Sequence, residues 1–206
     1  MATAKPTGLP LKWIAIGAVI VIILLVLGVI GMYNNFVTLD QGVKSAWSEV
    51  ENQYQRQADL IPNLVSTVSS AVKVETKFVT DVTTARSQWQ NAPQGDLLSK
   101  DTAGVNLQNS INAFVRAVAT TENYPVLQAN KNYVALQDEL VGTQNRLANS
   151  RRLYIDAIQA YNTAIQRFPG VLFAGMFGFA SKQYYQATPS AMTTPIIGNV
   201  GSTTLP

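Results

Sequence analysis

Charged side chains on otherwise apolar helical stripes are the residues of this sequence with the clearest potential for chemistry. Glu75 and Arg86 share a stripe with several valines, and a charge on a buried face must be paired. We expect partners on a later helix, so the predicted inter-helix polar network contains Glu75, Arg86, Glu139, Arg146, Arg151 and Arg152. A solvated margin of the stripe or a structural ion-pair network is the favoured interpretation, and a buried functional pocket is the alternative.

The residue types that are absent exclude most catalytic chemistry. The chain contains no Cys and no His, which removes thiol nucleophiles, Cys/His zinc sites, imidazole acid–base catalysis and Ser-His-Asp triads. No phosphate-binding loop, dinucleotide fingerprint or metal-ligand spacing is present. We therefore predict no enzyme, no catalytic residue, no cofactor and no metal, with a carboxylate-dependent hydrolase as the remote alternative. The net charge of +3 is not concentrated in a basic cluster, so nucleic acid is not an expected partner.

The segment from Trp13 to Met32 predicts a membrane span. It holds no ionisable residue, and its length matches a hydrocarbon core about 30 Å thick. A cleaved signal peptide is the competing interpretation, but its apolar region would be shorter and followed by small residues. Lys5 and Lys12 precede the span, so the positive-inside rule predicts a single-pass protein of the cell membrane with a cytoplasmic N-terminus and the remainder outside.

Two helical stripes of near-heptad, coiled-coil-like spacing follow the span. The first begins at Phe36, and the second continues after Pro62 as far as Trp89. A proline inside a helix loses a hydrogen bond and costs about 3 kcal/mol, whereas at a first helical position it is tolerated. With Asp59 just upstream as a cap, we predict a tight helix–helix connection at Asp59 and Pro62, and a kink in one continuous helix is the alternative.

Two further helices complete the predicted fold. A third carries Leu107 and Phe114 on one face, and a fourth and longest runs from about Val126 to Phe168. The predicted fold class is all-α: an N-terminal transmembrane helix followed by an elongated antiparallel bundle of about four helices. The predicted organisation is a cytoplasmic segment (1–12), the span (13–32), the bundle (33–169), an aromatic amphipathic segment (170–187) and a tail without intrinsic structure (188–206).

The aromatic segment from Val171 to Tyr185 is the candidate interface. Dense aromatic and small residues can pack across the end of the bundle, lie in a membrane interface or cover a partner chain, and all three remain open. The residues expected to form the contact are Phe173, Phe177, Phe179, Tyr184 and Tyr185.

Several motifs resemble the bacterial LemA family. They are DLIPNLV at 59–65, the AR pair at 85–86 and the ENYP to RFP block at 122–169. The resemblance covers most of the chain from Tyr33 to Tyr185 and implies a single anchor with a helical bundle, but no catalytic mechanism. The sequence departs from the family pattern at Gln57, Gln144 and Ile155, where the family often has basic, Glu and Asn residues, so a thinner polar network is expected.

The function predicted from these features is a non-enzymatic membrane scaffold. Its expected partners are the lipid bilayer, further copies of itself and other membrane or envelope proteins. An adaptor in membrane-linked signalling or envelope assembly that binds another protein is the alternative.

Overall fold

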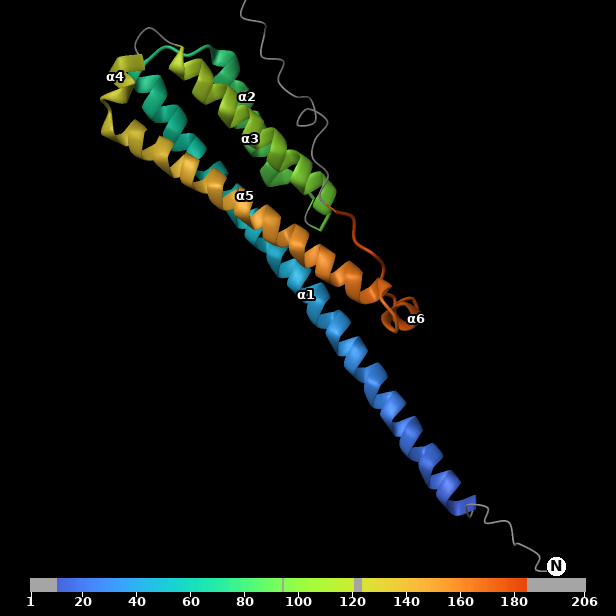
Figure 1. The fold of residues 1–206 in the computed structure, drawn as a ribbon. Coiled ribbons are helices and arrows are strands. Elements are labelled where there is room, and N and C mark those ends of the chain that lie inside the picture. The colour runs from blue at the N-terminus through green and yellow to red at the C-terminus, as the bar shows by residue number, and fades with distance from the viewer. Residues whose placement is uncertain (1–10, 94, 121–123, 185–206) are drawn as a thin grey trace, which may run out of the picture.

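The computed structural model describes residues 11–93, 95–120 and 124–184, and every regular element within these ranges is an α-helix (Figure 1). The fold class predicted from the sequence is confirmed. The helices are α1 (Leu11–Ala71), α2 (Thr76–Asn91), α3 (Leu97–Ala119), α4 (Tyr124–Gln128), α5 (Lys131–Gln166) and α6 (Gly170–Ala174).

Helix α1 is a single rod that contains both the apolar segment and one wall of the bundle. Its 61 residues correspond to about 90 Å at 1.5 Å per residue. The residues from 13 to 27 are exposed along its N-terminal part, and burial begins at Phe36 (Figure 1). The apolar segment and the bundle are therefore joined by uninterrupted helix, and the boundary near residue 32 is a change of environment rather than of backbone.

The predicted connection at Asp59 and Pro62 is wrong. Pro62 lies inside α1 on an exposed face, and the helix continues to Ala71. Because proline has no N–H, the carbonyl of Ala58 four residues earlier loses its intrahelical donor. Arg86 on α2 supplies a replacement, since its Nε donates to Ala58 O at 2.9 Å. The chain instead turns after Ala71, and the next helix begins at Thr76.

The last long helix also differs from its predicted bounds. The segment expected to be one helix from about Val126 to Phe168 is divided into α4 and α5. Asn130 makes the division, because its side chain accepts hydrogen bonds from the backbone N–H groups of Asn132 and Tyr133 and so caps α5. At 61 residues, α1 rather than α5 is the longest described helix.

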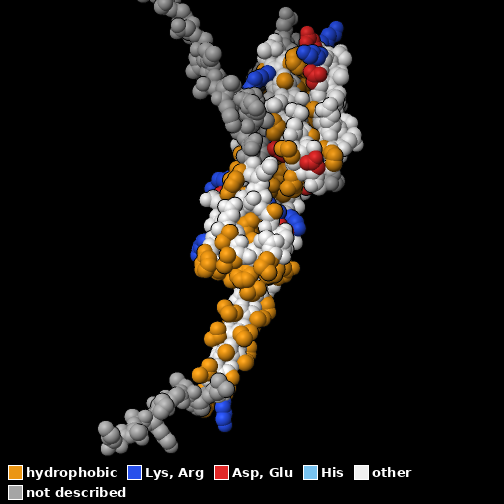
Figure 2. All heavy atoms as spheres, turned by 90° about the vertical axis from the view of Figure 1, so that its right-hand side faces the viewer, with side chains coloured by type: hydrophobic (Ala, Val, Ile, Leu, Met, Phe, Trp, Pro, Cys, Tyr) orange, Lys and Arg blue, Asp and Glu red, His pale blue; other side chains and the backbone are white. Residues whose placement is uncertain are grey.

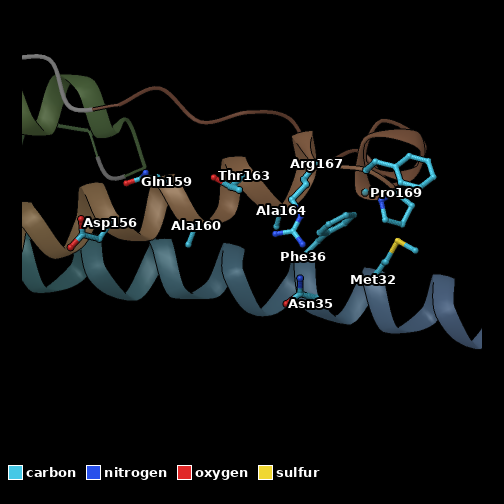
Figure 3. A pocket seen from close by; sticks show the side chains of 12 residues that line it. Met32, Asn35, Phe36, Asp156, Gln159, Ala160, Thr163, Ala164, Arg167 and Pro169 are labelled. Carbon is cyan, nitrogen blue, oxygen red and sulfur yellow. The ribbon is translucent and has the colours of Figure 1, made fainter.

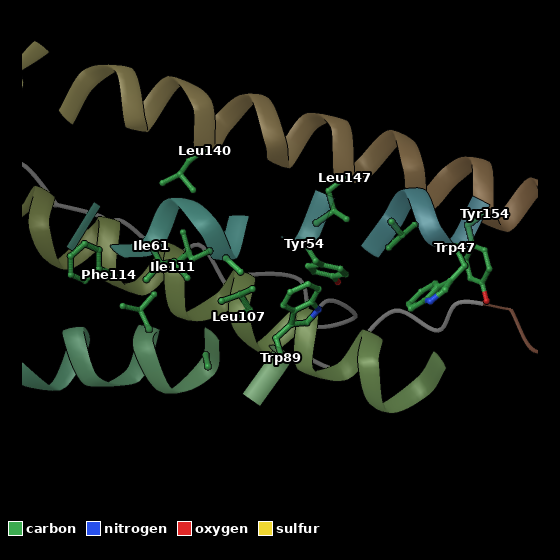
Figure 4. Close-up of a cluster of buried hydrophobic side chains, with 14 of the residues drawn as sticks. Trp47, Tyr54, Ile61, Trp89, Leu107, Ile111, Phe114, Leu140, Leu147 and Tyr154 are labelled. Atoms are coloured by element: carbon green, nitrogen blue, oxygen red, sulfur yellow. The ribbon is translucent and has the colours of Figure 1, made fainter. Parts of the chain in front are cut away.

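The core lies where α5 and the α2–α3 hairpin both pack against α1. Helix α5 runs antiparallel to α1 along its length, and α2 and α3 pair with each other beside them (Figure 1). Figure 4 shows Leu147, Tyr54 and Trp89 pointing toward one another from α5, α1 and α2. The largest fully buried side chains are Tyr54, Tyr133, Tyr161, Phe36, Phe114, Ile61, Leu64, Leu107, Ile111, Leu127, Leu147 and Ile158.

Candidate functional site

A buried polar cluster lies at mid-bundle around Tyr54. The Tyr54 hydroxyl accepts a hydrogen bond from Nη2 of Arg151 on α5 and lies 3.4 Å from Oδ1 of Asp101 on α3, to which it donates. Nη1 of Arg151 reaches Oε1 of Gln108 at 3.4 Å. The Tyr54 ring fits because Gly104 has no side chain: a Cβ there would lie 2.3 Å from the ring's Cζ. The cluster thus joins α1, α3 and α5 through one phenol.

The electrostatics of this cluster are those of a structural contact between helices. Burial raises the pKa of Asp101, while the Arg151 charge and the Tyr54 hydrogen bond oppose that rise. Burial, followed by the Asp101 charge, also raises the pKa of Tyr154. Since Tyr54 has no exposed surface, its hydroxyl cannot reach a solvent-borne substrate without opening the bundle. A cation and a partly desolvated carboxylate held by one buried phenol stabilise helix packing.

Lys100 is a buried charge that the sequence analysis missed. Its Nζ donates to the backbone oxygen of Trp89 at 3.0 Å and lies 4.5 Å from the centroid of that indole. The accepting carbonyl is in the last turn of α2, where a cation interacts favourably with the helix dipole. The spacing of the apolar residues could have predicted its burial, because Lys100 lies on the buried α3 stripe that continues through Gly104, Leu107 and Ile111.

The predicted six-residue network is distributed over separate contacts. Glu139 and Arg146 form an ion pair at 2.7 Å on a half-exposed surface, with Arg56 at 4.0 Å from the same carboxylate. Arg86 binds the Ala58 carbonyl, and Arg151 belongs to the Tyr54 cluster. Glu75 lies exposed at the N-cap of α2, and exposed Arg152 donates to Asn149 at 3.3 Å.

The positions that depart from the family pattern have different environments. Gln57 has no exposed surface, and neither amide atom has a hydrogen-bond partner among the described residues. Gln144 donates from Nε2 to Oδ1 of Asn112 on α3 at 3.0 Å, while Ile155 is partly buried on α5. Of the three, Gln57 thus leaves a polar group unsatisfied in the core.

A second polar cluster ties the segment after α6 to the bundle. Nζ of Lys182 lies 2.7 Å from Oδ1 of Asp40, whose other oxygen pairs with Lys44 at 2.8 Å. The backbone of Lys182 exchanges two hydrogen bonds with the side-chain amide of Asn162, at 2.8 and 2.9 Å. Partial burial raises the pKa of Asp40, but hydrogen bonds and charge from Lys182 and Lys44 outweigh it, and the pKa lies below its ordinary value.

The predicted aromatic interface is used in part within the chain. Phe177 and Phe179 pack edge-on against Tyr33, with ring centroids 5.2 and 5.8 Å apart, and Phe179 also contacts Phe36 at 5.4 Å. Phe173 stacks on Phe177 at 6.4 Å. Tyr184 is half exposed, and Tyr185 lies outside the described residues. Packing on the same chain therefore accounts for Phe177 and Phe179.

An open groove of about 590 Å³ lies between α1 and α5 at this end of the bundle (Figure 3). Met32 and Phe168 form part of its apolar wall, and Arg167 and Asp156 contribute charged groups. In the ranges that the structure describes, no group of three or more Asp, Glu, His or Cys side chains is placed to hold a metal ion. The groove can accept an apolar chain with a polar end but presents no assembled catalytic set.

Helix α1 contains the one segment of the described chain that is long and apolar enough to cross a membrane, and none of that segment is buried by the rest of the protein. This feature supports a membrane localisation. The predicted residues from 13 to 32 lie within the N-terminal half of the helix.

Comparison with known proteins agrees with the resemblance in the sequence. The profile of the LemA family matches residues 46–198, more than half of the chain. The magnetosome protein MamQ 2 of Paramagnetospirillum magneticum is 26% identical over 186 residues, covering 80% of this chain and 68% of the relative. The magnetosome protein MamQ of Magnetospirillum gryphiswaldense is 27% identical with the same coverage. With its apolar helix, its antiparallel bundle and a profile match over most of the bundle, this chain belongs to the LemA family.

Proposed function

We propose that this protein is a non-enzymatic, single-pass membrane scaffold that holds a rigid helical bundle outside the cytoplasmic membrane and binds other proteins, including copies of itself. The observation that carries the proposal is the continuity of α1 from the exposed apolar segment into the core of the bundle. A helix without a break transmits the orientation of the membrane segment to the bundle, as a spacer requires.

The polar groups of the interior support a structural role. Arg86, Arg151 and Lys100 each contact a backbone carbonyl or a side chain of a different helix or helix end. Such contacts keep the helices in one arrangement, and they leave these cations occupied rather than free to bind substrate. The relatives are named as magnetosome proteins, which is compatible with a role as one component of a larger assembly. That role is attributed to this chain only as part of the proposal.

In this proposal, copies of the protein contact one another through the outer face of α5. Val134 and Val141 lie two helical turns apart and are 39% and 53% exposed, and Ala148 continues the same line. Chains anchored in one membrane are confined to two dimensions, which raises their effective concentration and populates weak lateral contacts. The low fraction of charged residues, 13%, reduces the repulsion that would oppose such contacts.

Oxidative crosslinking in membranes tests the self-association, because the chain has no cysteine of its own. Val141→Cys should form a disulfide-linked dimer of the full-length protein. Leu98→Cys, an exposed apolar position on α3, is the matched control and should stay monomeric. A monomer at Val141 under the same conditions would refute contact through α5, and equal dimer from both variants would indicate random collision.

The orientation is tested separately. A reporter fused after Tyr184 should be active only on the outer side, as the lysines before the span predict. Activity confined to the cytoplasm would show that the bundle stays inside.

The non-enzymatic role is tested by assaying the purified full-length protein on a panel of hydrolase substrates. Turnover that is lost in Asp101→Asn would contradict this role.

A further inference from the structure

An apolar surface remains exposed at the base of the bundle after the aromatic packing is complete. Phe168, Leu172 and Met176 are spaced four residues apart and are 74%, 59% and 79% exposed, with Val171 beside them. Figure 2 shows hydrophobic side chains gathered around the base of the bundle, directly next to the single helix that leaves it. A water-facing surface of this kind is uncommon on a soluble domain and marks a binding surface.

The height of this surface along α1 is set by close contacts. Phe177 packs on Tyr33, the first residue after the apolar segment, and Met32 and Phe168 line the same groove. Gly170 brings α6 against α1 and α5, since a Cβ there would lie 2.3 Å from the Ala164 carbonyl oxygen and 3.0 Å from the Phe36 ring. The exposed residues are thus held at the level where the apolar segment of α1 ends.

The chemistry of the segment matches a lipid surface. Between Arg167 and Lys182 the sequence has no carboxylate, so the stretch between them is uncharged and aromatic-rich. Lys182 at one border is paired with Asp40, whereas Arg167 at the other border is exposed. Aromatic side chains are favoured at the boundary between acyl chains and headgroups, and cations near it are attracted to anionic lipids. Arg167 is exposed and can extend toward phosphate while its stem stays against apolar groups.

We propose that α6 and its flanks, residues 168–176, form a membrane-contacting foot that inserts into the lipid interface beside α1. The apolar surface of the foot is continuous with that of the span, so one bilayer covers both. The foot gives the protein a second point of membrane contact, which restricts the tilt of the rod relative to the membrane.

Spin labels at single cysteines test the foot in the full-length protein. Leu172→Cys and Met176→Cys are labelled and reconstituted in vesicles of phosphatidylcholine and phosphatidylglycerol. Power saturation then compares collisions with oxygen, which concentrates in lipid, and with a water-soluble nickel chelate. Ile20→Cys in the middle of the span and Leu98→Cys on α3 are the reference positions, and all four side chains are more than half exposed, so labelling leaves the core intact.

The expected result is an oxygen-to-nickel accessibility ratio at Leu172 and Met176 that is shifted from the Leu98 value toward the Ile20 value. A ratio equal to that at Leu98 would show a foot in water and overturn the proposal. Low access to both reagents, with dipolar broadening between labels, would also overturn it, because a second copy would then cover the surface. Neither the accessibility ratio nor the dipolar broadening at these labels depends on self-association through α5. Failure of the membrane-contact proposal can therefore be distinguished from failure of the scaffold proposal.

Discussion

The side chain of Arg86 donates a hydrogen bond to the carbonyl of Ala58, the group that Pro62 leaves without an intrahelical donor. Ala58 has no exposed surface, so water cannot easily replace that donor. A charged donor from α2 thus compensates for the proline in α1. The AR pair supplies the hydrogen bond that the proline of DLIPNLV removes from Ala58, the residue just before that motif.

This relationship predicts a coupling between two substitutions. Arg86→Met should lower the free energy of unfolding by about 1.5–3 kcal/mol, because it leaves a buried carbonyl unsatisfied. In a Pro62→Ala background the new backbone N–H bonds to Ala58, so Arg86→Met should cost distinctly less. Urea unfolding of the four full-length proteins in detergent, followed by circular dichroism, gives the coupling energy. Additive effects would show that the two residues act independently.

The continuity of α1 through Pro62 predicts a distance. Asn52 and Ser70 are both exposed and lie 18 residues apart on one face of the helix, which corresponds to about 27 Å between their Cα atoms. Spin labels at Asn52→Cys and Ser70→Cys should report a narrow distribution near that value by pulsed dipolar spectroscopy. A much shorter distance would restore the helix–helix connection at Pro62.

The contact of Tyr54 with Gly104 predicts a large effect from one methyl group. In Gly104→Ala the new Cβ would overlap the Tyr54 ring, which is held by Asp101 and Arg151, and stability should fall by about 1–3 kcal/mol. Gly42→Ala is the control, because nothing lies within 4 Å and a helical Gly→Ala change stabilises by about 0.5–1 kcal/mol. Thermal unfolding of both variants gives the comparison; opposite signs are expected, and equal signs would contradict the overlap.

Gln57 predicts a stabilising substitution. Its amide is buried without a partner among the described residues, so Gln57→Leu removes the cost of desolvation and should raise stability by about 1–2 kcal/mol. Gln55→Leu is the control, because Gln55 is exposed and lies two residues before Gln57 on α1. This substitution should change stability by less than about 0.5 kcal/mol. Loss of stability in Gln57→Leu would show that the amide is hydrogen-bonded in the folded protein.

The Asp40 cluster predicts a pH dependence. The pKa of Asp40 is lower in the folded state than in the unfolded chain, so its contribution is complete above the unfolded pKa of about 3.9 and is lost as pH falls through the folded pKa. Asp40→Asn should therefore cost about 1 kcal/mol at neutral pH and less below pH of about 4. Melting temperatures from neutral to acidic pH test this, with exposed Asp156→Asn as control. If the difference in melting temperature between the wild-type protein and Asp40→Asn does not change with pH, the ionisation of Asp40 does not contribute to stability.

The sequence was sufficient for those features that depend on local patterns. The length and lack of charge from Trp13 to Met32 predicted the membrane segment, and the periodic apolar residues predicted an all-α bundle. The DLIPNLV and ENYP motifs identified the family that the profile match confirms. In each case the signal is carried by neighbouring residues and requires no knowledge of what packs against them.

The tertiary structure alone decided what happens at Pro62 and which charges are buried. Local chemistry favours a helix end at a proline, but the donor that offsets its missing N–H comes from Arg86 on another helix. Arg151 meets Tyr54 although 97 residues separate them in the sequence, and Lys182 meets Asp40 although most of the bundle lies between them in the sequence. Such contacts depend on how helices are placed against one another, and a stripe pattern defines only which face is buried, not which residue it will meet.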